Sequence, residues 1–203
     1  EGAPKTATMN VHFPAGRNVG LGFSAISDEI GPVSETNLYV DFSYTLNFSN
    51  DNRLAFGVKA GGTFHDVGLI DLSLIDPNDP FFANDINENT PNVGAGIYFY
   101  KPNNYYISVS VPNILESVHL DNNDFNIGSE TRHIFAAAGY VFDINENFKF
   151  KPHTFVKYAS QSPISLDVNA NLFMYDLVEI GAGYRTDDSI TAMINFMVSP
   201  SIR

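Results

Sequence analysis

The chain has 203 residues, 44% of them hydrophobic, and its 11 basic residues face 23 acidic ones, giving a formal net charge of −12 at pH 7. This acidic balance argues against nucleic acid as a partner, because phosphate contacts require lysine and arginine. The chain has no cysteine, which excludes disulfides and thiolate metal sites, and no apolar run near the roughly 18 residues that a membrane-spanning helix needs.

A two-residue hydrophobic period runs along almost the whole chain and predicts eleven β-strands and no helix. In chain order the strands are expected at 6–13, 19–25, 38–48, 53–64, 93–100, 105–111, 132–142, 148–158, 164–174, 178–184 and 190–198. One face of each strand carries aliphatic and aromatic residues, and the other carries glycine, hydroxyl and charged residues. In the strand 132–142 two sets compete, and we take the even-numbered set, with Ile134 and Tyr140, as apolar.

The expected connections alternate in length. Short turns are predicted around 14–18, 49–52, 101–104, 143–147 and 174–177, whereas longer links are predicted over 28–35, 66–91 and 113–131. These longer links are rich in acidic residues and contain no Lys or Arg, which predicts one strongly acidic end. The layout is that of an all-β, antiparallel, up-and-down transmembrane β-barrel, since soluble sandwiches usually cross over.

In such a barrel the apolar face meets lipid and the polar face lines the lumen. Aromatic residues near strand ends are expected to form the interfacial girdles. These are Tyr39, Phe48, Phe64, Tyr100, Tyr105, Tyr158 and Tyr184.

The polar face contains charges that the strand register brings together. Pairing Phe42 with Val58 across the turn at 49–52 places Asp41 opposite Lys59, which predicts an ion pair in the lumen. A second group consists of the stripe Lys149, Lys151, Lys157 with His153, and of Asp167 and Glu179 on the next two strands. The stripe could select anions in a pore, or the two carboxylates could neutralise it in a plugged lumen.

No arrangement of residues in the sequence indicates an enzyme, a metal site or a cofactor. His12, His65 and His153 have polar neighbours, but none has the spacing of metal ligands. A hydrolase triad would have to combine His153 with Ser165 and Asn169, which polar lumen residues explain better. The stretch DPNDP at 76–80 is interpreted as a proline-stiffened turn, with weak calcium binding as the alternative.

The link 66–91 is far longer than a hairpin turn needs, and links of this length are usually functional or disordered. It carries apolar residues among carboxylates, so it is predicted either to plug the mouth of the barrel or to bind a partner. The residues expected to contact a partner are Ile70, Leu72, Asp76, Asp79, Phe81, Phe82 and Asp85.

Seven stretches together resemble the PorP/SprF family of type IX secretion system membrane proteins. They are EGAPKT at 1–6, NVGLGFSAISDEIGP at 18–32, RLAFGVKAG at 53–61, DPNDPFFAN at 76–84, PNVGAGIYFY at 91–100, YISVSVPNIL at 106–115 and FKFKPHTFVKY at 148–158. The resemblance implies a Bacteroidota-type outer-membrane barrel that serves secretion, gliding adhesins or their surface attachment. It also implies further strands, about fourteen in the full-length protein, because bacterial single-chain barrels usually have an even number.

From the resemblance we expect a non-enzymatic, multi-pass barrel of a Gram-negative outer membrane, one domain over 1–203, with its acidic links outside the cell. The expected partners are outer-membrane lipid, secreted cargo with a C-terminal sorting domain, and periplasmic and outer-membrane components of the secretion or gliding machinery. The alternative is a diffusion porin or small-solute transporter, which single-channel conductance would reveal.

Overall fold

The structure is a computed structural model that describes residues 3–69, 85–116, 118–122, 125–129, 131–160 and 162–197. These residues form β-strands and one 3-10 turn, η1 (Ser49–Asp51). The strands are β1 (Lys5–Pro14), β2 (Val19–Ile30), β3 (Val33–Asn47), β4 (Arg53–Val67), β5 (Ile86–Lys101), β6 (Tyr105–Val111), β7 (Val118–Asn122), β8 (Phe125–Ser129), β9 (His133–Tyr140), β10 (Phe142–Asn145), β11 (Phe148–Ala159), β12 (Ser165–Met174), β13 (Val178–Arg185) and β14 (Ser189–Phe196). The described part of the chain contains no helical segment with the length and hydropathy of a membrane span.

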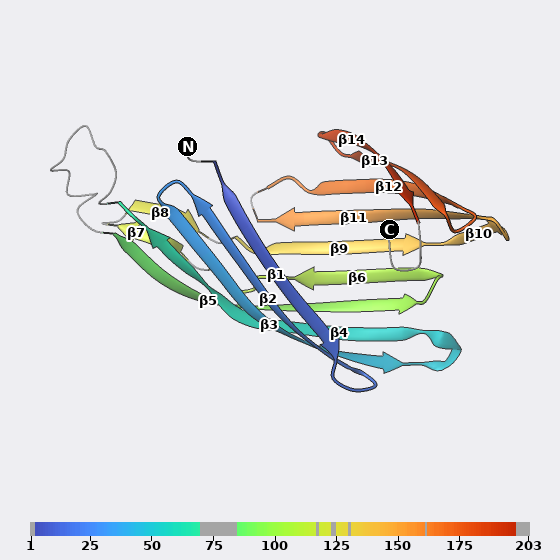
Figure 1. Cartoon of the computed structure of the whole chain (residues 1–203), viewed down its shortest axis with the longest axis horizontal. Helices are drawn as coiled ribbons and strands as arrows, with labels where there is room; N and C mark the ends of the chain where they lie inside the picture. The colour runs from blue at the N-terminus through green and yellow to red at the C-terminus, as the bar shows by residue number, and fades with distance from the viewer. Residues whose placement is uncertain are drawn as a thin grey trace. The chain divides into compact units, whose positions relative to one another are not determined.

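Eleven strands pair in the order β1-β2-β3-β4-β5-β6-β9-β11-β12-β13-β14, and β10 pairs with β11 as the twelfth strand of the sheet. Strands β1 to β3 pair antiparallel, and so do β6, β9 and β11 to β14 in this order. Figure 1 follows this meander from β1 in blue to β14 in red. The predicted all-β, up-and-down arrangement is confirmed. The eleven predicted strands are present, but the one predicted at 132–142 is divided at Val141 into β9 and β10, and β7 and β8 are additional strands, so the described residues form fourteen strands.

Two compact units divide the contacts of the chain. Unit 1 consists of Glu1–Tyr44, Gly57–Ala95 and Pro112–Arg132, and unit 2 consists of Thr45–Phe56, Gly96–Val111 and His133–Arg203. The boundaries fall within strands β3, β4 and β5, which contribute residues to both units. The features of each unit are described separately below, and the single domain over 1–203 stays a prediction.

The link predicted over 28–35 is wrong. Strands β2 and β3 stay paired through Ile30 and Val33, so only Gly31 and Pro32 form the turn. Gly31 has φ of +58°, a conformation that two-residue hairpins require at a central position and that glycine adopts without a steric penalty.

The predicted link 113–131 also contains structure that the sequence reasoning missed. Strands β7 and β8 pair there as a separate two-stranded sheet, with Val118 opposite Ser129 and Asn122 opposite Phe125. Part of this link is therefore a β-hairpin rather than irregular chain.

The apolar face of the sheet is the exposed one. The register aligns Val11 of β1 with Phe23 of β2 and Val40 of β3, and these three side chains are all exposed. In unit 2 the same face carries Ile107, whose row runs through Val168 of β12. By contrast, the hydrophobic residues buried within the described part of the chain are Tyr39, Val67, Leu69 and Ala159. A sheet with this inverted distribution is stable only when an apolar medium covers it.

The register also decides which face of β9 is apolar. Ala136 lies opposite Val156 and Ile134 lies opposite Tyr158, so the even-numbered residues of β9 share the apolar face of β11. The choice of the even set is therefore confirmed. Phe135 points to the other face, where its ring stacks on Phe155 with 5.7 Å between centroids.

This arrangement predicts that a charge is tolerated differently on the two faces of β12. Val168 is 52% exposed on the apolar face, so Val168→Arg should reduce the free energy of unfolding from a bilayer by roughly 2 to 4 kcal/mol if it lies near the midplane. Asn169→Arg, the neighbouring change on the polar face, should have a smaller effect because its charge does not enter hydrocarbon. Equal losses for both variants in a bilayer unfolding assay would contradict the assignment of the faces.

Candidate functional site

A row of aromatic rings follows the apolar face of unit 2 near the short turns. The rings are Phe99, Tyr105, Tyr140, Phe142 and Phe150, and successive centroids lie 5.9, 6.3, 4.5 and 6.5 Å apart. They come from β5, β6, β9, β10 and β11, and the hydroxyl of Tyr105 also donates to Asn52 Oδ1 at 2.9 Å. Such a row has the form of an interfacial aromatic girdle, with one apolar side and hydroxyls at its edge.

The sequence assigned only part of this girdle correctly. Tyr105 belongs to it, whereas Tyr39 and Tyr100 lie on the polar face, Tyr39 being 6% exposed and Tyr100 stacked on Tyr98. Phe99 and Tyr140 were missed as girdle residues. Their positions on the apolar face, next to a short turn, are the signal that could have identified them.

The polar face of unit 1 holds a chain of polar contacts. Thr63 donates to Asn37 Oδ1 at 2.6 Å, and the Asn37 amide donates to Glu35 Oε1 at 2.7 Å. Glu35 Oε2 in turn lies 3.4 Å from His65 Nδ1. Thr63 is one of the few buried polar residues, so these contacts satisfy groups that water does not reach.

Contacts between β3 and β4 support the register that the sequence predicts around Asp41. Thr63 bonds Asn37, and a methyl group at Gly61 would lie 2.7 Å from Cδ1 of Tyr39, so Thr63 lies beside Asn37 and Gly61 beside Tyr39. Two residues further along each antiparallel strand, the same register places Lys59 beside Asp41. The Lys59 ammonium lies 3.9 Å from the centre of the Tyr39 ring, a cation–π contact that the sequence reasoning missed.

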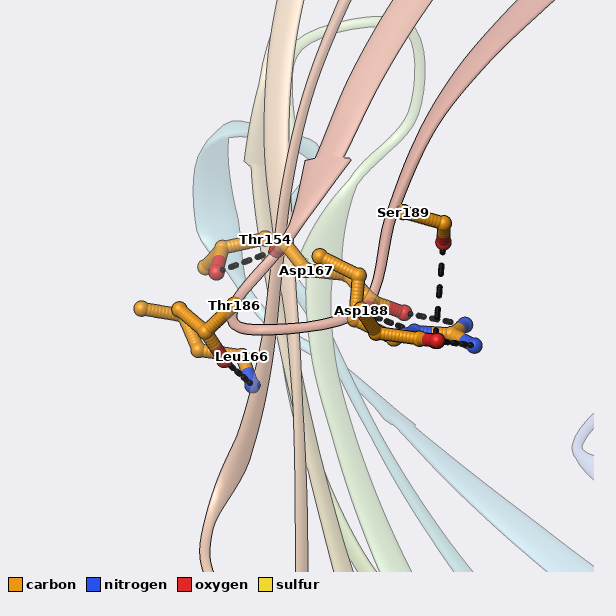
Figure 2. Close-up of polar contacts among 7 residues, drawn as sticks. Thr154, Leu166, Asp167, Thr186, Asp188 and Ser189 are labelled. Atoms are coloured by element: carbon orange, nitrogen blue, oxygen red, sulfur yellow. Dashed lines mark hydrogen bonds and ion pairs between the residues drawn. The ribbon is translucent and has the colours of Figure 1, made fainter.

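An arginine at the end of β13 organises the polar face of unit 2. Arg185 donates through Nε and Nη2 to both oxygens of Asp167, at 2.6 and 3.0 Å, and through Nη1 to Asp188 at 3.2 Å. Figure 2 shows Asp167, Asp188 and Ser189 together, on the other side of the strands from Thr186. Two bonds from a planar guanidinium fix both distance and orientation, so this fork holds β12 and β13 in register.

The lysine stripe on β11 meets different partners along its length. Lys149 Nζ lies 2.9 Å from Asp176 Oδ1, Lys151 lies 5.9 Å from the centre of the Tyr106 ring, and Lys157 lies 5.6 Å from that of Phe155. Asp167 attracts Lys157 of this stripe, while its hydrogen bonds and those of Glu179 go to other residues. Asp167 binds Arg185, and Glu179 accepts hydrogen bonds from the amides of Asn171 and Asn195.

The possible hydrolase residues do not come together. His153 lies directly opposite Asn169, but Ser165 lies opposite Lys157, four positions further along β11. Four residues of a strand span about 13 Å, beyond the reach of a nucleophile and its base. The residues that the structure describes include no group of three or more His, Asp or Glu that could hold a metal ion.

Most of the residues predicted to contact a partner lie outside the described residues. These are Ile70, Leu72, Asp76, Asp79, Phe81 and Phe82, and the DPNDP turn lies there as well. Asp85, the seventh, is described, and its Oδ1 accepts a hydrogen bond from the backbone N–H of Leu69 at 2.8 Å. Leu69 is buried, so the first and last described residues beside this link are bonded to each other and belong to unit 1.

Two side chains hold the start of the second long link: Asn92, and Arg132, whose Nε donates to the carbonyl of Ile114 at 3.1 Å. Asn92 donates through Nδ2 to the carbonyl of Leu115 at 3.0 Å, and its Oδ1 accepts from the N–H groups of Leu115 and Val93 at 3.2 and 2.8 Å. The N–H of Ile114 also donates to the carbonyl of Val93 at 2.8 Å. Asn92 is almost fully buried, so residues 113–115 are fastened to β5.

A family model described as "Type IX secretion system membrane protein PorP/SprF" matches residues 1–203. The chain belongs to the PorP/SprF family. No match was found among curated proteins or among solved structures. As a PorP/SprF protein the chain is a membrane component of type IX secretion, which accounts for the exposed apolar face and its aromatic row.

The contact between Lys59 and Tyr39 in this PorP/SprF protein is testable by a double-mutant cycle. Lys59→Met and Tyr39→Leu should show favourable coupling of about 0.5 to 2 kcal/mol, since the ring is buried and the ammonium lies over it. A parallel cycle with Asp41→Asn measures the predicted ion pair. The longer contact of Lys157 with Phe155 should couple more weakly, and absence of coupling between Lys59 and Tyr39 would refute the contact.

Proposed function

We propose that this protein is a non-enzymatic barrel of a Gram-negative outer membrane that binds secreted proteins carrying a C-terminal sorting domain, or adhesins. On this proposal it also binds periplasmic and outer-membrane components of the secretion or gliding machinery. Membership of the PorP/SprF family, over the whole chain, is the observation that carries the role in secretion.

The exposed apolar face supports insertion into the outer membrane. A strand in hydrocarbon must have all its backbone N–H and C=O groups bonded, and closure into a barrel provides this for the strands at the two ends of the pairing order, β1 and β14. The aromatic row in unit 2 supports a membrane boundary at the short turns. By the layout of outer-membrane barrels, the short turns then face the periplasm and the long links face the outside.

The hydrogen bonds at the ends of the two long links support the use of these links as a binding surface. The bond between Leu69 and Asp85 joins the ends of one link, and Asn92 holds the start of the other. Binding residues are most effective on segments that a rigid scaffold positions. An acidic surface that rests on a fixed base fits a protein partner, because opposite charges orient an encounter.

Replacing Phe81 and Phe82 together by Ala should abolish retention of the secreted cargo at the cell surface while the barrel still assembles. The two rings are the aromatic anchors expected in the link 66–91, and anchors of this kind carry most of an interface's affinity. Tyr175→Ala, which removes an exposed aromatic residue from a short turn, serves as the matched control. Normal retention with raised membrane conductance would instead favour the diffusion porin.

The clamp on the second link gives an independent test that uses described residues only. Asn92→Leu removes the two hydrogen bonds between Asn92 and Leu115 and leaves the N–H and C=O of Leu115 without this partner, so the backbone around Leu115 should be held less firmly against β5, while the bond from Ile114 to Val93 remains. We expect faster hydrogen exchange and proteolysis there, with β11 to β14 unchanged. Unaltered protection of this segment would show that Asn92 does not hold it.

A further inference from the structure

The polar face of unit 2 contains a pocket near the short turns, which we call the tyrosine pocket. Its volume is about 710 Å³, and it is lined by Tyr98, Tyr100, Tyr106, Lys149, Lys151 and Glu179 among others. This volume is within the range of about 300 to 1,000 Å³ that is common for sites binding small molecules. The proposal made here does not depend on the binding of cargo at the long links.

Three tyrosine rings make one wall of the tyrosine pocket. Tyr98 stacks on Tyr100 with 4.7 Å between centroids, and it contacts Tyr106 with 5.9 Å between centroids. Tyr98 remains 39% exposed, so part of the ring is open to a ligand. Tyr106 lies across Gly139 of β9, where a methyl group would come within 2.5 Å of its Cε1. The glycine thus leaves the space that the wall requires.

The charges in the tyrosine pocket are unequally satisfied. Lys149 is held by Asp176 at 2.9 Å, and Glu179 accepts two amide hydrogen bonds. Lys151 lies two residues further along the same face of β11, and its ammonium lies 5.9 Å from the centre of the Tyr106 ring. Its ammonium can meet an incoming anion beside tyrosine hydroxyls that also donate, and the lining holds one further lysine, Lys101, and one further carboxylate, Asp143.

We propose that the tyrosine pocket binds a small carboxylate attached to a ring. The carboxylate would accept hydrogen bonds from Lys151 and from the phenol groups, which are charge-assisted and strong where water is partly excluded. The ring would lie against Tyr98, because an aromatic ring or the C–H face of a sugar ring packs favourably on an aromatic face. Both parts are needed, so acetate and uncharged rings should bind poorly. Such a group occurs in aromatic carboxylates and in sugar acids.

The test is calorimetry on the full chain in detergent micelles with two pairs of probes. N-acetylphenylalanine is compared with its neutral amide, and glucuronate is compared with glucose. We expect at least one of the two carboxylates to bind about tenfold more tightly than its neutral partner, which corresponds to one charge-assisted hydrogen bond. The pair that shows the difference tells whether the ring is aromatic or a sugar.

Lys151→Gln should remove the preference for the carboxylate. Lys157→Gln is the matched control, since Lys157 lies on the same strand and face but outside the lining of the tyrosine pocket. Gly139→Ala should displace Tyr106 and weaken binding of the ring, whereas Gly68→Ala, which meets no close neighbour, should not. Failure of both carboxylates to bind, or equal binding by the Lys151→Gln and Lys157→Gln variants, would overturn the proposal.

Discussion

The alternation of side chains along each strand is the constraint on which the other features depend. Because successive residues point to opposite faces, an apolar residue at every second position gives each strand one face suited to lipid and one suited to polar contacts. Antiparallel pairing then extends these faces across neighbouring strands, as in the row from Val11 to Phe23 and Val40. A shift by one residue would turn charged side chains toward hydrocarbon, so the membrane itself selects the register.

On the polar face, large and charged side chains pack against one another. Glycines lie opposite the largest residues, as Gly61 does for Tyr39 and Gly139 does for Tyr106. Charges are satisfied by the partner that the register places nearest, which is the Arg185 guanidinium for Asp167 and the face of the Tyr39 ring for Lys59. The stability of this face therefore comes from many local contacts rather than from a hydrophobic core.

The alternation of apolar and polar residues was sufficient to predict eleven strands, their order along the chain and the apolar face of β9, but not the hairpin of β7 and β8. The pairing of Asp41 with Lys59 stays a prediction. Alternation was insufficient where the result depends on side-chain position or on a single backbone angle. The tight turn depends on the positive φ of Gly31, whereas the acidic residues on both sides of it suggested a longer link. The pairing of Asp167 with Arg185 depends on which donor side chain reaches the Asp167 carboxylate. The tyrosine pocket was missed because its residues come from strands β5 to β14 and converge only in three dimensions.

The length of three neighbouring strands has a consequence for where the acidic chemistry is presented. Strands β3, β4 and β5 contain 15, 15 and 16 residues. A bilayer is crossed by about 9 to 11 residues, so roughly five residues of each strand, or about 16 Å, extend past the hydrocarbon. The pairing of Asp28 with Glu35 lies beside the tight turn, at the far end of such an extension. The carboxylates of Asp28 and Glu35 are thus carried on a paired, hydrogen-bonded extension of the sheet rather than on an unpaired loop, so the backbone itself fixes their distance from the apolar part of the strands.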